Sequence, residues 1–135
     1  MTWSIDVEAG GLVRLDPGGE RPQLKEALED CVGSVSPAGT PPRLSTYWID
    51  LVLAGLSSVV PLESVIASAN AWSFVRHGDM VTARFDYSEE GEEESETIPV
   101  DELVVGLSVY REAVLEALEN GHQLDERWWA QRNPY

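Results

Sequence analysis

The sequence predicts an α+β fold: an antiparallel sheet of about four or five strands with two or three helices packed on one face. Two observations predict it. Runs with period-two alternation, typical of strands, follow one another closely and are joined by short turns. Stretches with apolar residues at helical spacing are separate from them, which favours an antiparallel sheet beside helices over alternating βαβ units. We expect the 135 residues to form a single domain, 1–135.

The first strands are expected within residues 2–15. Residues 2–7 alternate apolar and polar side chains, residues 9–11 have turn composition, and residues 12–15 are interpreted as the return strand. A helix is expected from Pro22, because proline suits a first helical turn and four apolar residues then share one face: Leu24, Ala27, Leu28 and Cys31.

The middle of the chain is less clear. Residues 34–42 have loop composition and are expected to form a flexible connector. Residues 44–60 carry an apolar stripe at helical spacing, but a pair of buried strands is the alternative because the run ends in β-branched residues. We expect the helix, ended by Pro61, and a further helical turn over residues 62–69.

The second half begins with the strongest strand signal. Residues 71–77 and 80–87 predict a hairpin around a tight turn. An acidic loop follows, then a short strand at residues 96–100 and a long helix over residues 101–120. The alternation in the second hairpin strand predicts that Thr82, Arg84 and Asp86 face one side of the sheet, and Val81, Ala83, Phe85 and Tyr87 the other.

The net charge is strongly negative, −15, from 24 acidic and nine basic residues, not counting histidine. No lysine or arginine lies between Arg84 and Arg111. A field of this sign repels nucleic acid and anionic lipid and attracts cationic partners. We therefore expect a basic protein partner, no nucleic acid and no membrane; that the charge serves only solubility is the alternative.

The composition favours the cytoplasm. The single cysteine, Cys31, excludes an internal disulfide and fits a reducing compartment. Residues 1–8 show no signal-peptide pattern, and no apolar run approaches the roughly 18 residues that a membrane span needs. We expect a cytoplasmic protein.

The densest acidic segment is residues 86–96. Gly91 stands where a calcium loop needs glycine, but Thr97 occupies the position of the bidentate Glu, so an EF-hand is rejected. A loose divalent-cation site, a solvated loop and a docking surface for a basic protein all remain open. The candidate partner surface combines the carboxylates with two aromatic anchors: Asp86, Tyr87, Glu89, Glu90, Glu92, Glu93, Glu94, Glu96 and Trp128.

No catalytic, cofactor or metal motif is complete. His77 and His122 lack the spacing of a metal-binding set, and a small hydrolase or divalent-cation-dependent enzyme using carboxylates with His77 is the alternative function. Asp50 is the acid expected to be buried, as an ion pair with Arg76 or Arg84. The sequence predicts no cofactor, no catalytic residue and no metal ligand.

Two adjacent tryptophans, Trp128 and Trp129, either fold back onto the sheet as a lid or sit exposed and mark an interface. We expect them to fold back, because exposed tryptophans would promote aggregation. Self-association through an edge strand at residues 2–7 is a third function class, so a homodimer also remains open.

One resemblance covers roughly the C-terminal half. Residues 72–87 with the acidic loop, the segment Ile-Pro-Val-Asp-Glu-Leu at 98–103 and Tyr-Arg-Glu-Ala-Val-Leu at 110–115 resemble small uncharacterised acidic actinobacterial proteins. They are also similar in build to immunity-type proteins of bacterial toxin loci. The resemblance implies a non-enzymatic protein that covers a toxin domain, and it assigns no residue roles. The leading hypothesis is therefore a protein-binding module.

Overall fold

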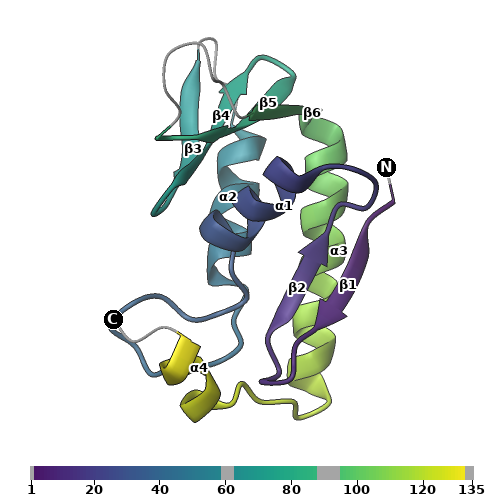
Figure 1. Ribbon diagram of the computed structural model, residues 1–135. Helices are drawn as coiled ribbons and strands as arrows, with labels where there is room; N and C mark the ends of the chain where they lie inside the picture. The colour runs from purple at the N-terminus through teal and green to yellow at the C-terminus, as the bar shows by residue number, and fades with distance from the viewer. Residues whose placement is uncertain (1, 59–62, 88–94, 133–135) are drawn as a thin grey trace.

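The computed structural model describes residues 2–58, 63–87 and 95–132. The predicted α+β class is confirmed, with helices beside two antiparallel sheets (Figure 1). In chain order the elements are β1 (Ser4–Val7), β2 (Val13–Asp16), α1 (Pro22–Cys31), α2 (Tyr47–Ser57), β3 (Ser64–Ser68), β4 (Trp72–His77), β5 (Met80–Phe85), β6 (Ser95–Pro99), α3 (Val100–Glu119) and α4 (Glu126–Arg132).

The larger sheet has four strands in the order β3-β4-β5-β6. The predicted hairpin is confirmed, because β4 and β5 pair along their whole length and Gly78, with a φ of 58°, lies in the turn between them. The short strand predicted at residues 96–100 is confirmed as β6, which pairs with β5. Helices α1, α2 and α3 lie on one face of this sheet (Figure 1).

Strand β3 corrects one prediction. A helical turn was expected over residues 62–69, but the structure forms a strand there that pairs Ser64 with Arg76 and Ser68 with Ser73. The segment is five residues long, which suits a strand and is too short for a stable helix. Hydrogen bonding to the edge of β4 therefore decides the conformation of residues 64–68.

The first hairpin forms a sheet of its own, β1-β2, which lies against α3. Two long-range contacts fix it there. The indole of Trp3 lies against Gly106, where any Cβ would overlap the ring. The hydroxyl of Tyr110 donates a hydrogen bond to the carbonyl oxygen of Val13 at 3.0 Å.

The buried hydrophobic side chains of both sheets and of α1, α2 and α3 form one cluster. The predicted face of α1 is confirmed as its buried face. The helical interpretation of the middle segment is confirmed as α2, which buries Ile49, Val52 and Leu56. In the described ranges, none of the helices combines the length and the hydropathy needed to cross a membrane.

Asp50 is not the buried acid that was expected. It follows Ile49 on α2, and because successive helical residues are about 100° apart, it points away from the core. Its carboxylate accepts a hydrogen bond from Nε of Arg111 on α3, at 2.7 Å, with 47% of the side chain exposed. The predicted partner Arg76 instead donates to the carbonyl oxygens of Leu56 and Ser58 at the end of α2.

Candidate binding groove

The predicted acidic surface is only partly described. Asp86, Tyr87, Glu96 and Trp128 are placed by the structure. Five of its carboxylates lie outside the described residues: Glu89, Glu90, Glu92, Glu93 and Glu94. The four placed residues have different roles.

Asp86 is engaged within the sheet. Its two carboxylate oxygens accept hydrogen bonds from the hydroxyl of Ser73, at 2.8 and 2.9 Å, and Nε of Arg84 lies 3.9 Å away. The next residue, Tyr87, is 71% exposed, and its ring lies 5.9 Å from that of Phe85. Of this pair, Tyr87 is therefore the side chain open to a partner.

Glu96 acts inside the fold. From β6 its carboxylate accepts the backbone N–H groups of Gln23 and Leu24, at 3.4 and 3.1 Å, in the first turn of α1. The N-cap residue of that helix, Arg21, makes no side-chain capping bond. Glu96 supplies the missing acceptor, and its negative charge suits a helix N-terminus.

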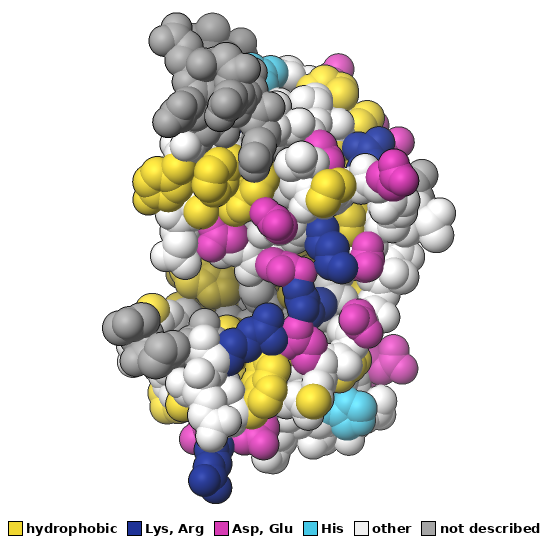
Figure 2. Space-filling view, in the orientation of Figure 1, with side chains coloured by type: hydrophobic (Ala, Val, Ile, Leu, Met, Phe, Trp, Pro, Cys, Tyr) yellow, Lys and Arg dark blue, Asp and Glu magenta, His cyan; other side chains and the backbone are white. Residues whose placement is uncertain are grey.

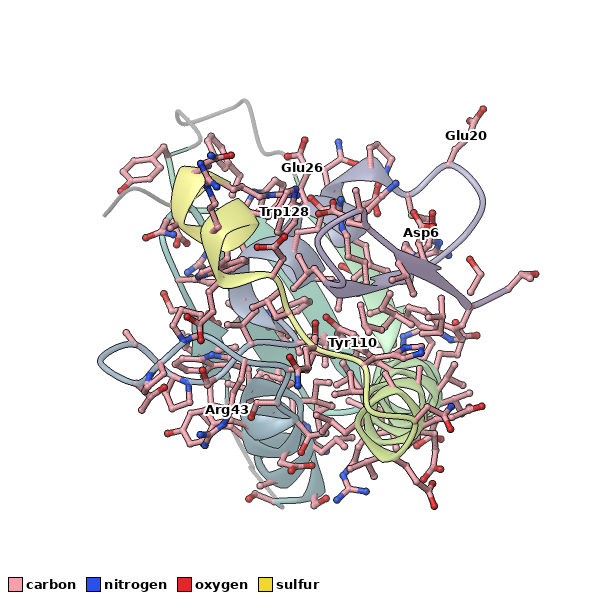
Figure 3. All side chains as sticks on the ribbon, turned by 90° about the horizontal axis from the view of Figure 1, so that it is seen from below. Asp6, Glu20, Glu26, Arg43, Tyr110 and Trp128 are labelled. Carbon is pink, nitrogen blue, oxygen red and sulfur yellow. The ribbon has the colours of Figure 1, made fainter. Side chains whose placement is uncertain are left out.

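Trp128 folds back, and it does so onto the first hairpin rather than onto the four-stranded sheet. Its indole lies against Gly10 so closely that a Cβ on Gly10 would overlap the ring. The guanidinium of Arg132 stands over the same indole, 5.2 Å from the ring centroid. Figure 3 shows Trp128 between α4 and the first hairpin.

A hollow with a volume of about 790 Å³ lies beside α4. We call it the α4 groove. Figure 2 shows the surface hollowed on this side of the molecule. Its walls come from distant parts of the chain: residues 12–15, 28–40, 42, 48, 68–70, 110, 129, 130 and 132.

The polar groups of the groove walls bond to the protein itself. The hydroxyls of Ser34 and Tyr110 both donate to the carbonyl oxygen of Val13, at 2.7 and 3.0 Å. The carboxylate of Asp30 accepts the backbone N–H groups of Ala71 and Trp72, at 2.9 and 3.0 Å. These bonds use polar atoms of the wall residues Ser34, Tyr110 and Asp30 within the protein itself.

Two ionisable groups of the groove are held in their neutral forms. Burial, reinforced by the negative charges of Asp30 and Asp86, raises the pKa of the Cys31 thiol to about 12. Burial likewise raises the pKa of Tyr110 to about 12, and Figure 3 shows this side chain in the interior beside α3. Near neutral pH neither group is a nucleophilic anion.

A chain of ion pairs forms one rim of the groove. Arg14 pairs with both Glu8 and Glu29, and Glu8 pairs in turn with Arg132 of α4. Only 16% of the Glu8 side chain is exposed. Figure 2 shows basic and acidic side chains alternating across this face. The pairs link α4 to the first hairpin and to α1.

The histidines lie elsewhere. His77, about half exposed, has Nδ1 3.7 Å from Glu63, and His122 is exposed just after α3. Neither lines the α4 groove. Across the part of the chain that the structure describes, no group of three or more His, Cys, Asp or Glu side chains is arranged to hold a metal ion.

Sequence reasoning missed the groove and most of its residues. Residues 34–42 were predicted to be a flexible connector, yet they form a wall that is tied by a bridge between Val35 and Leu44 and by the hydrogen bond from the Ser36 hydroxyl to the carbonyl of Pro41. Their loop composition was the available signal, because loops held by a rigid scaffold often carry binding surfaces.

No protein-family model, curated protein or solved structure gives a significant match to the chain.

Proposed function

We propose that the protein is a non-enzymatic binding module of the cytoplasm, and that the α4 groove takes a segment of a basic partner protein. The groove is the observation that carries this proposal. Its volume of about 790 Å³ falls within the range of about 300–1,000 Å³ that is usual for binding clefts, and Trp48 and Trp129 lie in its walls. A hollow with aromatic walls is the usual place for the anchor residues of a partner.

The bonding within the walls favours a protein over a small molecule. A small-molecule site needs several polar groups that point into the cavity and fix the orientation of the ligand. Here Ser34, Tyr110 and Asp30 direct their polar atoms at the backbone of the protein itself. What remains for a ligand is a surface of mixed polar and apolar character with charged groups at one rim, and protein–protein interfaces have this mixed character.

The charge of the chain favours a basic partner. At −15 the chain attracts cations over long distances, and residues 86–96 carry seven of its carboxylates. Exposed Tyr87 offers a second apolar anchor. A toxin domain with a basic surface is one partner of this kind, and an immunity-type inhibitor is the form of binding module that we propose for it.

The test uses a matched pair of substitutions. A partner captured from cells is first identified and purified, and its Kd is then measured by calorimetry with purified variants. Ala38 is exposed and lines the groove, whereas Ala54 is exposed on α2 outside it. Ala38→Trp fills the groove and is expected to weaken binding by roughly tenfold or more, and Ala54→Trp to leave it unchanged.

Equal affinity for the two variants would rule out the α4 groove as the binding site. A loss of affinity with Ala54→Trp alone would place the partner on the α2 face instead. Far-ultraviolet circular dichroism checks that both variants fold: their spectra should match that of the parent chain.

A further inference from the structure

Strand β1 has one free edge. Its other edge pairs with β2, and the outer edge of β2 is covered, because the carbonyl of Val13 accepts hydrogen bonds from Ser34 and Tyr110. Of the described elements, Figure 1 shows β2 on one side of β1 and none beside it on the other. An open edge of this kind can pair with a further strand.

The ladder between β1 and β2 decides which backbone groups point outward. The N–H of Glu8 donates to the carbonyl of Leu12 at 2.9 Å, and hydrogen-bonded pairs alternate with non-hydrogen-bonded pairs along an antiparallel ladder. The next pair, Val7 with Val13, is therefore non-hydrogen-bonded, in agreement with the outward bonds of the Val13 carbonyl. The N–H and C=O groups of Ile5 and Val7 thus point away from β2. On that side they have no hydrogen-bond partner within the described residues.

The edges of the four-stranded sheet are protected against such pairing. Strand β3, at one edge, has a register shift between Val65 and Ala67. Strand β6, at the other edge, ends in Pro99, which has no N–H group to donate. Bulges and prolines are devices by which edge strands avoid pairing. Strand β1 has a regular register and no proline, so its edge stays open to another strand.

We propose that β1 pairs with β1 of a second copy, so that the protein forms a two-fold dimer through this edge. Because the outward groups belong to odd-numbered positions, only odd-numbered positions can form the hydrogen-bonded pairs. The register centred on Ile5 pairs Ile5 with Ile5 and Val7, which is 58% exposed, with Trp3 of the second copy. It also places Asp6 opposite Ser4. A register centred on Asp6 would oppose two carboxylates, and one centred on Ser4 pairs fewer residues of β1.

Exposed valines of α3 border the same edge. Gly106 of α3 lies against Trp3 of β1, and Tyr110 reaches Val13 of β2. Because successive helical positions are about 100° apart, Val105 and Val109 lie on the side of Gly106 away from β2. Their side chains are 56% and 39% exposed. The surface next to the free edge of β1 is therefore apolar.

The valines are covered in the dimer. Helix α3 lies against both strands of the hairpin, and neighbouring strands are about 4.8 Å apart. Two strand spacings separate equivalent positions of the two hairpins, so the two α3 helices lie about 10 Å apart, at the upper end of the spacing of packed helices. Val105 and Val109 of each copy then face α3 of the other copy, beneath a continuous sheet of four strands.

The charge of the chain gives this dimer a characteristic salt dependence. Each copy carries −15, and Glu112 and Glu116 lie beside the valines on the exposed side of α3. Salt screens the repulsion between the copies, so added salt strengthens the dimer. Binding of a basic partner has the opposite dependence, because salt screens an attraction. Strand β1 does not line the α4 groove, so this proposal and the proposed function can fail separately.

Sedimentation equilibrium of the full chain at low and high salt tests the dimer. We expect a monomer–dimer equilibrium that shifts towards the dimer at high salt. Val7→Pro removes an outward N–H without taking a hydrogen bond from the pairing with β2, and we expect it to weaken the dimer by roughly tenfold or more. A chain that stays monomeric at millimolar concentration, or a Val7→Pro dimer as stable as that of the parent, would overturn the proposal.

Substitutions at Ser4 make the test independent of any effect of proline on folding. Ser4 is exposed and, in the dimer, lies opposite Asp6 of the second copy. Ser4→Lys creates two cross-strand ion pairs and is expected to strengthen the dimer by roughly fivefold relative to Ala54→Lys, which makes the same charge change on α2. Ser4→Asp is expected to weaken it by a similar factor relative to Ala54→Asp. Equal dimer affinities of the two Ser4 variants would overturn the pairing through β1.

A strand of the basic partner is the alternative occupant of this edge. A partner captured from cells and purified is tested for binding to the parent chain and to Val7→Pro by calorimetry. A monomeric chain whose partner binds Val7→Pro much more weakly than the parent would assign the edge to that partner and overturn self-pairing. An equal affinity for both, together with the dimer, is the result that we expect.

Discussion

At the scale of single residues, Glu96 joins two parts of the chain that are distant in sequence. Its carboxylate on β6 accepts N–H groups of Gln23 and Leu24 at the start of α1. Losing a side-chain acceptor at a helix N-terminus costs about 1 kcal/mol. We expect Glu96→Ala to lower the free energy of unfolding by about that amount in urea denaturation, and Glu26→Ala, on the exposed side of α1, to change it by less than about 0.5 kcal/mol. Equal effects would exclude the capping role.

The same residue marks a limit of sequence reasoning. The density of carboxylates at residues 86–96 indicated a negative surface, but a carboxylate gives no sign in the sequence of which donors will meet it. Glu96 meets amides more than 70 positions away, and Asp86 meets Ser73 across the hairpin. The alternation of β5 did predict the face of the sheet that Asp86 would take. The local periodicity of a strand predicts the face on which a side chain lies, whereas the hydrogen-bond partners of that side chain depend on tertiary packing.

At the scale of elements, α2 and α3 are joined both by packing and by an ion pair, and the two differ in strength. Leu107 of α3 is fully buried, so Leu107→Ala is expected to lower the free energy of unfolding by about 2–5 kcal/mol. Asp50 and Arg111 are each at least 40% exposed, so Asp50→Asn is expected to lower it by less than about 1 kcal/mol. Thermal or urea unfolding measures both. Similar losses would mean that the ion pair, not packing, holds the helices.

The contribution of Asp50 has a definite pH dependence. Partial burial opposes its ionisation, but the hydrogen bonds from Arg111 and Thr46 and the charge of Arg111 outweigh this and lower its pKa below 3.8. A depressed pKa in the folded state stabilises the protein above the unfolded value. That stability is lost as the pH falls below about 3.8 and through the folded value.

Elements were predictable where their own residues decide their structure. The hairpin of β4 and β5 carries its turn and its alternation in one short segment, and α1 carries its buried face. The prediction of a helical turn at β3 was wrong because a segment of five residues fits either conformation. Pairing with the edge of β4 selects the strand.

At the scale of the whole molecule, the net charge sets how a basic partner approaches. Replacing Glu89, Glu90, Glu92, Glu93 and Glu94 by Gln changes the net charge from −15 to −10. We expect the association rate of a purified basic partner to fall by roughly tenfold at low salt and to change little at high salt, where screening shortens the reach of the field. Stopped-flow measurements check this. The five Glu→Asp replacements keep the charge and are expected to keep the rate; equal rates for both variants would contradict a role of the field.

The α4 groove exists only at this scale. Its walls come from the first hairpin, the end of α1, the loop after it, α2, the β3–β4 turn, α3 and α4. No short segment carries a signal for it, because each contributes one or two surfaces whose meeting depends on the whole fold. The composition predicted the negative net charge of the chain. The α4 groove could not be predicted in this way, because it forms only when the elements pack together.

The attachment of the first hairpin to α3 has a consequence for biosynthesis. Tyr110 and Val13 are 97 positions apart, and Trp3 needs Gly106 to cover its ring. At about 5–20 residues per second, a ribosome takes about 5 to 20 seconds to make the stretch between them. Until α3 is made, the side of the nascent hairpin that α3 covers in the folded protein stays in water, so this surface is open to chaperones and proteases while the chain is being made.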